Sequence, residues 1–408
     1  MIAPEEAWRR IHERITARAP SQTRRTAALG RVLASTVAAQ VDVPPFDTSA
    51  MDGFAVDGDV SPGSILEISA TLAAGDSPGH TLRPGSAVRI MTGAPVPEGA
   101  NRVVPIEASE LQRQADGDRR RVRFPGGASG PDHIRRRGEV SQRGATLLDR
   151  GHLLGPGALA LLASHGVAEV EVHARPKVAS ITTGDEVVPP EREPDPGQIR
   201  DSHTDFLGAA LAQLGIVNEP LGIAPDDPAT LRRLVQEGLR RDVLLLSGGV
   251  SMGEFDLVEG VLADHGCEPL FDAVAIQPGK PMVAAVHPGG WVFALPGNPA
   301  SAMVCFWLFV RPALRRMLGF DDGFWHGALP ATALAPLPAA KGRDLFLPGV
   351  VELDPERGVG VRVVVPQGSH DVVAYAHGTV LVRLPKGTPE QPEGSRCEVL
   401  PLVEWVPG

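Results

Sequence analysis

The chain has 408 residues, of which 43% are hydrophobic and 22% are charged, a balance typical of a soluble globular protein. The net charge of −10 argues against a dedicated nucleic-acid-binding protein, and the longest apolar run, Ala300–Val310, is too short to span a bilayer. Three widely spaced cysteines argue against a disulfide framework. Because charged residues stand where a signal peptide needs an apolar core, we expect a cytoplasmic protein with no membrane partner and no nucleic-acid partner.

The first half of the chain is predicted to be mostly β-structure. Pro4 begins a short amphipathic helix that places Trp8, Ile11 and Ile15 on one face. From Val41 to about Arg143, short apolar runs alternate with turns such as GDSPG and FPGG, a spacing typical of a β-rich module. The segment that follows contains a predicted helix at 156–164 and a predicted strand at 168–172.

From Arg175 onward, predicted strands alternate with predicted helices. This rhythm indicates a parallel sheet with helices on both faces. The strands are 177–182, 216–223, 242–246 and 291–295, and the helices are 201–214, 228–240, 255–265 and one that runs from about 299 to 318. After Gly319 the sequence predicts a linker over 328–342 and then a small all-β domain with strands at 350–353, 361–365, 380–384 and 397–402.

Polar residues gather where the predicted parallel strands end, which is where open α/β sheets bind their ligands. Each of the four loops could instead be a helix cap, since Asp and Ser favour that position. Four such loops together favour a binding site. They contain Thr183, Gly184, Asp185 and Glu186; Asp226 and Asp227; Ser247, Gly248, Gly249, Ser251, Gly253, Glu254 and Asp256; and Pro296, Gly297, Asn298, Pro299 and Ser301.

The third loop combines a glycine turn with carboxylates. A glycine turn between a strand and a helix suits a phosphate, yet Glu254 and Asp256 would repel one. Neither GxGxxG nor GxxxxGK[ST] occurs, so a dinucleotide oxidoreductase and a P-loop hydrolase are not supported. A magnesium ion that bridges carboxylate and phosphate resolves the conflict. Lys280, between two prolines, is either a second phosphate contact or a solvated turn residue.

Seven motifs then appear in one order along the chain: DTSAMDGFAV, RIMTGAPVPEGA, IRRRGE, TTGDE, SGGVSMGEFD, PGKP and LPGNPASA. Together they resemble the molybdopterin molybdotransferases, the MoeA family, which includes the C-terminal domain of gephyrin. The resemblance implies an α/β plus β fold, in an elongated homodimer of four-domain subunits. It assigns residues 1–19 and 175–319 to a doubly wound, MogA/MoaB-like α/β domain, 41–143 to a β-rich domain, 20–40 with 144–174 to a mixed dimerising domain, and 320–408 to a C-terminal β-barrel-like domain.

The resemblance also assigns roles to individual residues. Asp52 and Thr92 would complete the cleft of the partner subunit, and Arg136 and Arg137 would be basic residues of the cleft. Glu186, Asp226 and Asp256 would be the functional acids and hold the metal. Ser247, Gly248, Gly249 and Ser251 would hold phosphate, Lys280 would contact the anion, Pro296, Pro299 and Ser301 would shape the fourth loop, and Ser369 would line the same cleft.

Such a protein would insert molybdenum from molybdate into adenylylated molybdopterin, with Mg²⁺-dependent hydrolysis of the adenylate, and would receive its substrate from a molybdopterin adenylyltransferase. Two departures keep an alternative open, a non-catalytic homologue that carries or senses the pterin or molybdate. Val140 replaces an acid that follows Glu139 in the family, and Gln277 replaces a lysine before PGKP. Asp201-Ser202-His203 replaces a DSN-type helix start, where we expect a capped helix rather than a metal ligand.

Overall fold

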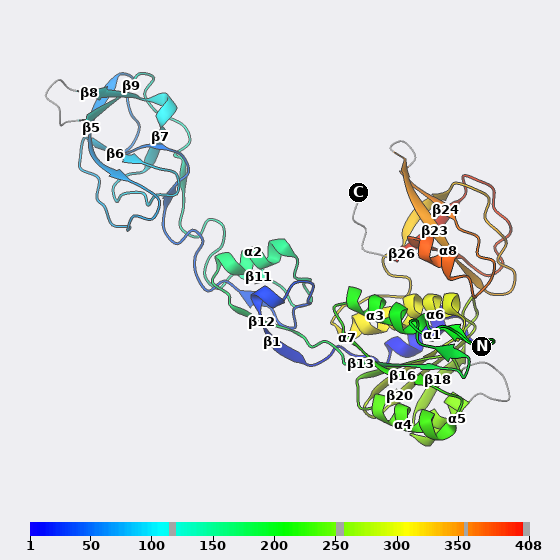
Figure 1. Ribbon diagram of the computed structural model, residues 1–408. Helices are drawn as coiled ribbons and strands as arrows, with labels where there is room; N and C mark the ends of the chain where they lie inside the picture. The colour runs from blue at the N-terminus through cyan, green and yellow to red at the C-terminus, as the bar shows by residue number, and fades with distance from the viewer. Residues whose placement is uncertain (114–119, 250–256, 355–357, 403–408) are drawn as a thin grey trace. The chain divides into compact units, whose positions relative to one another are not determined.

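The computed structural model describes residues 1–113, 120–249, 257–354 and 358–402 (Figure 1). The chain forms two compact units, one of Met1–Ser21 with His173–Gly408 and the other of Gln22–Val172. Among the described residues, no helix is long and apolar enough to cross a membrane.

The first unit is built on a six-stranded sheet with the strand order β16-β13-β17-β21-β20-β18. Its strands are β13 (Val178–Thr183), β16 (Asn218–Ala224), β17 (Val243–Ser247), β18 (Glu268–Ala273), β20 (Pro281–His287) and β21 (Gly290–Leu295). The predicted parallel arrangement is right for β13, β16, β17 and β21. The sequence did not predict β20 as a strand, and it is antiparallel to both neighbours because β20 and β21 are joined by a turn too short for a parallel crossover.

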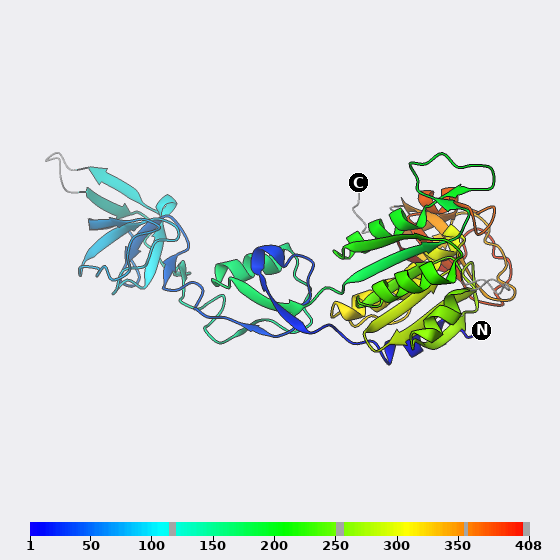
Figure 2. The ribbon, with the colours of Figure 1, turned by 60° about the horizontal axis from the view of Figure 1, so that its bottom comes forward.

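The central strands are buried on both faces, and this explains their continuous apolar sequence. In β17, Val243 and Leu245 belong to one core, while Leu244 and Leu246 belong to the other. Helices cover both cores, as Figures 1 and 2 show. The first core packs against α1 (Pro4–His12), α3 (His203–Gln213), α6 (Pro299–Cys305) and α7 (Arg311–Met317), and the second against α4 (Pro228–Gly238) and α5 (Leu257–Asp264).

The predicted long helix after the fourth loop is interrupted. Between α6 and α7 the backbone forms a π-helical segment, η3 (Phe306–Val310), in which all five side chains are buried. The total length agrees with the prediction, but the five-residue hydrogen-bonding pattern has no signature in the apolar sequence. A small ribbon of β14 (Val187–Val188) and β15 (Ile199–Arg200) also lies between β13 and α3.

The C-terminal domain of this unit is a closed five-stranded barrel, because β23 pairs with both β24 and β25. The predicted linker over 328–342 is partly wrong, since its first residues form a barrel strand that pairs with β26. Pro330 and two alanines hide the alternating pattern of this strand. The elements are β19 (Ile276–Gln277), which adds to β23, then β22 (Leu329–Ala333), β23 (Asp344–Asp354), β24 (Gly358–Val363), α8 (Val372–His377), β25 (Val380–Leu384) and β26 (Arg396–Pro401).

The second unit contains a six-stranded sheet with the order β7-β4-β6-β5-β9-β8 and a smaller α/β part around α2 (Pro156–Ser164). The predicted helix at 156–164 is confirmed. The strands are β1 (Pro20–Arg24), β2 (Val37–Ala38), β3 (Thr48–Ser49), β4 (Gly53–Val56), β5 (Ser64–Leu72), β6 (Ser86–Ile90), β7 (Arg102–Pro105), β8 (Glu110–Arg113), β9 (Arg120–Phe124), β10 (Ile134–Arg135), β11 (Thr146–Leu148) and β12 (Glu169–His173), with short helices η1 (Arg25–Ala27) and η2 (Ile106–Ala108).

Removal of one core side chain from β17 should destabilise the α/β domain. Leu245 is fully buried, so Leu245→Ala is expected to lower the free energy of unfolding by about 2–5 kcal/mol, from lost burial and the cavity that remains. Urea denaturation measures the change. Val217→Ala is the control, because Val217 is 85% exposed and its substitution should change stability by less than about 0.5 kcal/mol. Equal effects of the two variants would contradict this account of the core.

Candidate functional site

The carboxyl ends of β13 and β17 approach each other closely at the glycine turn. Gly248 has φ +94°, and a Cβ atom on it would lie 2.6 Å from Oγ1 and 2.7 Å from the carbonyl oxygen of Thr183. Thr183 Oγ1 in turn donates to the carbonyl of Ser247, at 3.4 Å. Only glycine allows both the backbone conformation and the contact, so the two strand ends and their loops form one wall.

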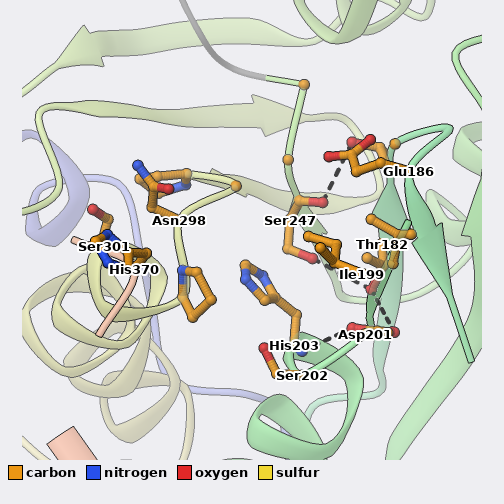
Figure 3. Close-up of a pocket in the computed structure, with 18 of the residues that line it drawn as sticks. Thr182, Glu186, Ile199, Asp201, Ser202, His203, Ser247, Asn298, Ser301 and His370 are labelled. Atoms are coloured by element: carbon orange, nitrogen blue, oxygen red, sulfur yellow. Dashed lines mark hydrogen bonds between the residues drawn. The ribbon is translucent and has the colours of Figure 1, made fainter. Parts of the chain in front are cut away.

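This wall borders a cavity of about 590 Å³. Figure 3 shows side chains from β13, the start of α3, the end of β17 and the loop before α6 around the same space. The four predicted loops all contribute. The lining residues are Thr182, Thr183, Gly184, Glu186, Val187, Ile199, Arg200, Asp201, Ser202, His203, Asp226, Ser247, Gly248, Gly249, Pro281, Pro296, Gly297, Asn298, Pro299, Ser301 and His370. Ser251, Gly253, Glu254 and Asp256 lie outside the described residues.

The structure separates the two adjacent acids of the second loop. Asp227 is the N-cap of α4, and its carboxylate accepts a hydrogen bond from the backbone of Thr230 at 2.8 Å. The side chain of Thr230, and then its backbone N–H, lower the pKa of Asp227. Asp226 instead lines the cavity, and burial, followed by the charges of Asp185 and Glu186, raises its pKa. The capping alternative therefore applies to Asp227 and not to Asp226.

Two carboxylates, those of Glu186 and Asp226, line the cavity. Asp185 does not occur among the described lining residues, but its carboxylate accepts a hydrogen bond from the backbone of Asp226 at 2.9 Å. Among the described residues, no three His, Cys, Asp or Glu side chains are grouped so as to hold a metal ion by themselves. Magnesium needs only one or two carboxylates when water and a ligand phosphate complete its shell. Burial raises the pKa of Asp226 most, and the nearby charges of Asp185 and Glu186 raise it further, so a cation would be favoured beside it.

The start of α3 forms the opposite border. The expected capped helix start is confirmed, because Asp201 Oδ1 accepts from the backbone of His203 at 2.8 Å and of Thr204 at 3.2 Å. Its Oδ2 accepts from the hydroxyls of Thr204, at 2.6 Å, and Thr182, at 3.2 Å. This network joins α3 to the end of β13 and holds His203 beside the cavity. Burial lowers the pKa of His203, which keeps its ring neutral.

A second cavity, of about 570 Å³, adjoins the first and shares Pro281, Asn298 and Ser301 with it. Its character is different. Lys280 and Arg343 line it, no carboxylate occurs among its described lining residues, and Ser301, Ser369 and Tyr375 add hydroxyls. Ser369 accepts a hydrogen bond from the backbone of Ala300 at 3.1 Å, which attaches the barrel loop to the start of α6.

The PGKP loop is packed tightly between these elements. Gly279 has φ +107°, and a Cβ atom on it would lie 2.7 Å from the sulfur of Cys305. Cys305 is fully buried in α6 and its thiol donates to the carbonyl of Gly279 at 3.4 Å. The helix therefore sets the position of the loop that carries Lys280.

Four predicted site residues lie in the second unit. Thr92 donates from its backbone N–H and its hydroxyl to Asp52 Oδ1, each at 2.7 Å, and these hydrogen bonds lower the pKa of Asp52. Arg136 forms ion pairs with Asp47 and Asp132, and Arg137 pairs with Asp42 at 2.7 Å. Their roles in a cleft completed by a partner subunit stay predictions.

Within the first unit, the structure brings most of the predicted residues to two adjoining cavities. Asp185, which was also predicted, contributes indirectly, because its carboxylate accepts a hydrogen bond from the backbone N–H of Asp226. The lining residues that were not predicted include Ile199, Arg200, Asp201, Ser202, His203 and His370 in the first cavity and Arg343 and Tyr375 in the second. The sequences DSH and QGSH could have indicated some of them. Arg343 had no local signal, because only the pairing of β19 with β23 brings it next to the PGKP loop, where it donates to the carbonyl of Ile276 at 3.0 Å.

The fold and the two cavities define a multidomain α/β protein with a candidate ligand site at the carboxyl ends of its parallel strands. Family models match the MoeA N-terminal region (domain I and II) over residues 2–166, the probable molybdopterin binding domain over residues 179–316 and the MoeA C-terminal region (domain IV) over residues 330–402.

The chain is similar to molybdopterin molybdenumtransferase 2 of Mycobacterium tuberculosis, with 34% identity over 417 residues that cover 99% of this chain and 100% of the relative. A molybdopterin molybdenumtransferase of Staphylococcus aureus is 33% identical over 372 residues, which cover 88% of this chain and 86% of the relative. The crystal structure of a molybdopterin biosynthesis MoeA protein from Pyrococcus horikosii matches with a TM-score of 0.82, 30% identity and coverage of 99% of this chain and 100% of that one. The chain therefore belongs to the MoeA family of molybdopterin molybdenumtransferases, and the predictions of family and fold class are confirmed.

A methyl group at the glycine turn should close the site without unfolding the domain. In Gly248→Ala the new Cβ would meet Thr183 and the backbone would be strained, so we expect ligand affinity to fall at least about tenfold. Calorimetric titration with molybdopterin measures this. Gly260→Ala is the matched control, since a Cβ there meets nothing within 4 Å and alanine favours the helix. Unchanged affinity in Gly248→Ala would contradict the assignment of the turn to the site.

Proposed function

We propose that this chain inserts molybdenum from molybdate into adenylylated molybdopterin and hydrolyses the adenylate, with release of AMP. The observation that carries the proposal is the sorting of charge between two adjoining cavities. The first contains a glycine turn and the acids Glu186 and Asp226, together with one arginine, Arg200, whereas the second contains Lys280 and Arg343 and no carboxylate among its described lining residues. A phosphoanhydride that travels with Mg²⁺ suits the first, and a tetrahedral dianion suits the second.

In the first cavity, the backbone amides of Gly248 and Gly249 would hold the phosphates of the adenylated pterin. Glu186 and Asp226 would hold magnesium, together with Asp256, which lies outside the described residues. When bound, magnesium would offset the negative charge that develops as the phosphoanhydride breaks. The hydroxyls of Thr183 and Ser247 lie at the same strand ends and would orient the phosphate.

In the second cavity, Lys280 and Arg343 would hold molybdate as a substrate, since hydrogen bonds from cations to an oxyanion are strong. Ser301 lines both cavities. The backbone carbonyl of Ser369 accepts a hydrogen bond from Ala300, which attaches the barrel loop to the start of α6. Molybdate bound there would lie next to the pterin that receives the metal. We further propose that the protein acts as a cytoplasmic homodimer in which Asp52 and Thr92 complete the partner's cleft, with a molybdopterin adenylyltransferase as donor.

A non-catalytic carrier of the pterin is the second candidate. The observation that favours it is Val140, which stands in place of an acid and is 71% exposed. Glu186 and Asp226, the acids that line the first cavity, instead favour the enzymatic function.

The deciding experiment is incubation with adenylylated molybdopterin, magnesium and molybdate, followed by measurement of AMP. We expect Asp226→Asn to lower AMP release at least about tenfold and to raise the magnesium requirement, because a ligand charge is lost. Asp227→Asn is the matched control. Asparagine still caps α4, so its activity should stay close to that of the wild type. If the wild type binds the pterin but releases no AMP, the proposed enzymatic function is refuted and the proposal of a non-catalytic carrier is supported.

The second cavity is tested through molybdate. Lys280→Met should raise the molybdate concentration for half-maximal cofactor formation by about 10- to 100-fold, because one charge-assisted hydrogen bond contributes about 1.5–3 kcal/mol. Affinity for molybdopterin should stay within about twofold. The exposed Lys341 gives the control Lys341→Met, with no change expected. An unaltered molybdate requirement in Lys280→Met would assign molybdate to another place.

A further inference from the structure

His203 is the first residue of α3, and its ring borders the first cavity. Its backbone N–H donates to Asp201 Oδ1 at 2.8 Å, so the position of the residue is set by the helix cap. The side chain is only 7% exposed, yet it is one of the cavity-lining residues. Figure 3 shows the ring between Ser247 and the loop that carries Asn298.

The two ring nitrogens have different surroundings. Nδ1 is shielded from solvent and has no hydrogen-bond partner among the described residues. The backbone of Gly297 acts on the ring to raise its pKa, as a carbonyl oxygen that faces a ring N–H does. Because Nδ1 has no partner, we assign the ring proton to Nε2. Burial is the larger influence and lowers the pKa, so the ring is neutral and Nδ1 presents a lone pair.

A buried acceptor without a donor is uncommon in folded proteins and calls for a partner. A phosphate oxygen cannot be that partner, because it is itself an acceptor. An N–H group on the ligand can be. The phosphate-binding features of the cavity, the glycine turn and the hydroxyls of Thr183 and Ser247, lie at the strand ends, whereas His203 lies at the start of α3.

We propose that His203 is a positioning residue that accepts, at Nδ1, a hydrogen bond from a ring or amino N–H group of a flat nitrogen heterocycle. The heterocycle is the pterin ring of the substrate, and this identification rests on the proposed function. His203 would then fix the orientation of the ring while the glycine turn fixes the phosphate, so that the two ends of the ligand are held by different elements.

Two variants separate hydrogen bonding from packing. Asparagine places an acceptor, Oδ1, the same number of bonds from Cβ as Nδ1 of histidine, and phenylalanine keeps a ring but has no acceptor. We expect His203→Asn to bind molybdopterin within about threefold of the wild type and His203→Phe to bind at least about tenfold more weakly. Affinity for pyrophosphate, which has no N–H group, should change in neither variant.

Anaerobic calorimetry gives these affinities. Equal affinities of His203→Asn and His203→Phe for molybdopterin would overturn the proposal, and so would a parallel loss of pyrophosphate affinity, which would indicate a packing role. ¹⁵N NMR of histidine-labelled wild type needs no variant to fold. The Nδ1 resonance should move upfield when molybdopterin is added, and an unmoved resonance with the ligand bound also overturns the proposal.

Failure of the role proposed for His203 can be distinguished from failure of the proposed enzymatic function. A wild-type chain that binds molybdopterin and releases no AMP refutes the enzyme and leaves the role of His203 intact. A wild type that releases AMP, with His203→Phe unchanged in molybdopterin affinity, refutes this inference alone.

Discussion

The close approach of β13 and β17 at their carboxyl ends is the constraint on which the site depends. Gly248 lies against Thr183 with no space for a side chain, and this contact brings the two loops to one wall of the first cavity. The buried central strands hold that wall in place, since alternate residues of β17 belong to the cores on the two faces of the sheet. The rigidity of the sheet is thus transferred to the loops that line the cavity.

The second organising feature is the separation of charge. Carboxylates gather where β13 and β16 end, in a cavity that Arg200 also lines, whereas the cavity where the PGKP loop meets the barrel has Lys280 and Arg343 and no carboxylate among its described lining residues. The shared residues Pro281, Asn298 and Ser301 keep the cavities adjacent without merging them. Two anions, one accompanied by a metal and one not, can therefore lie side by side.

Local sequence explains much of the fold. The apolar runs of the central strands, the amphipathic α4 and the proline at the start of α2 each predicted their element. The sequence did not predict β20 as an antiparallel strand, β22 as a barrel strand or η3 as a π-helical segment. Those features depend on the length of a connection, on pairing with a distant strand and on how a buried apolar helix packs, and none of these has a local signature.

The same division holds for the site. The order of seven motifs determined the family, and residue type at the strand ends determined that acids, glycines and a lysine would serve it. Only the tertiary structure decided that Asp227 caps a helix while Asp226 lines the cavity, because both are aspartates in one loop and differ only in direction. It alone placed Arg343 opposite Lys280 and His203 beside the phosphate turn. Residue type is local, whereas charge partners, burial and the choice between a cap and a ligand arise from groups that are far apart in the chain.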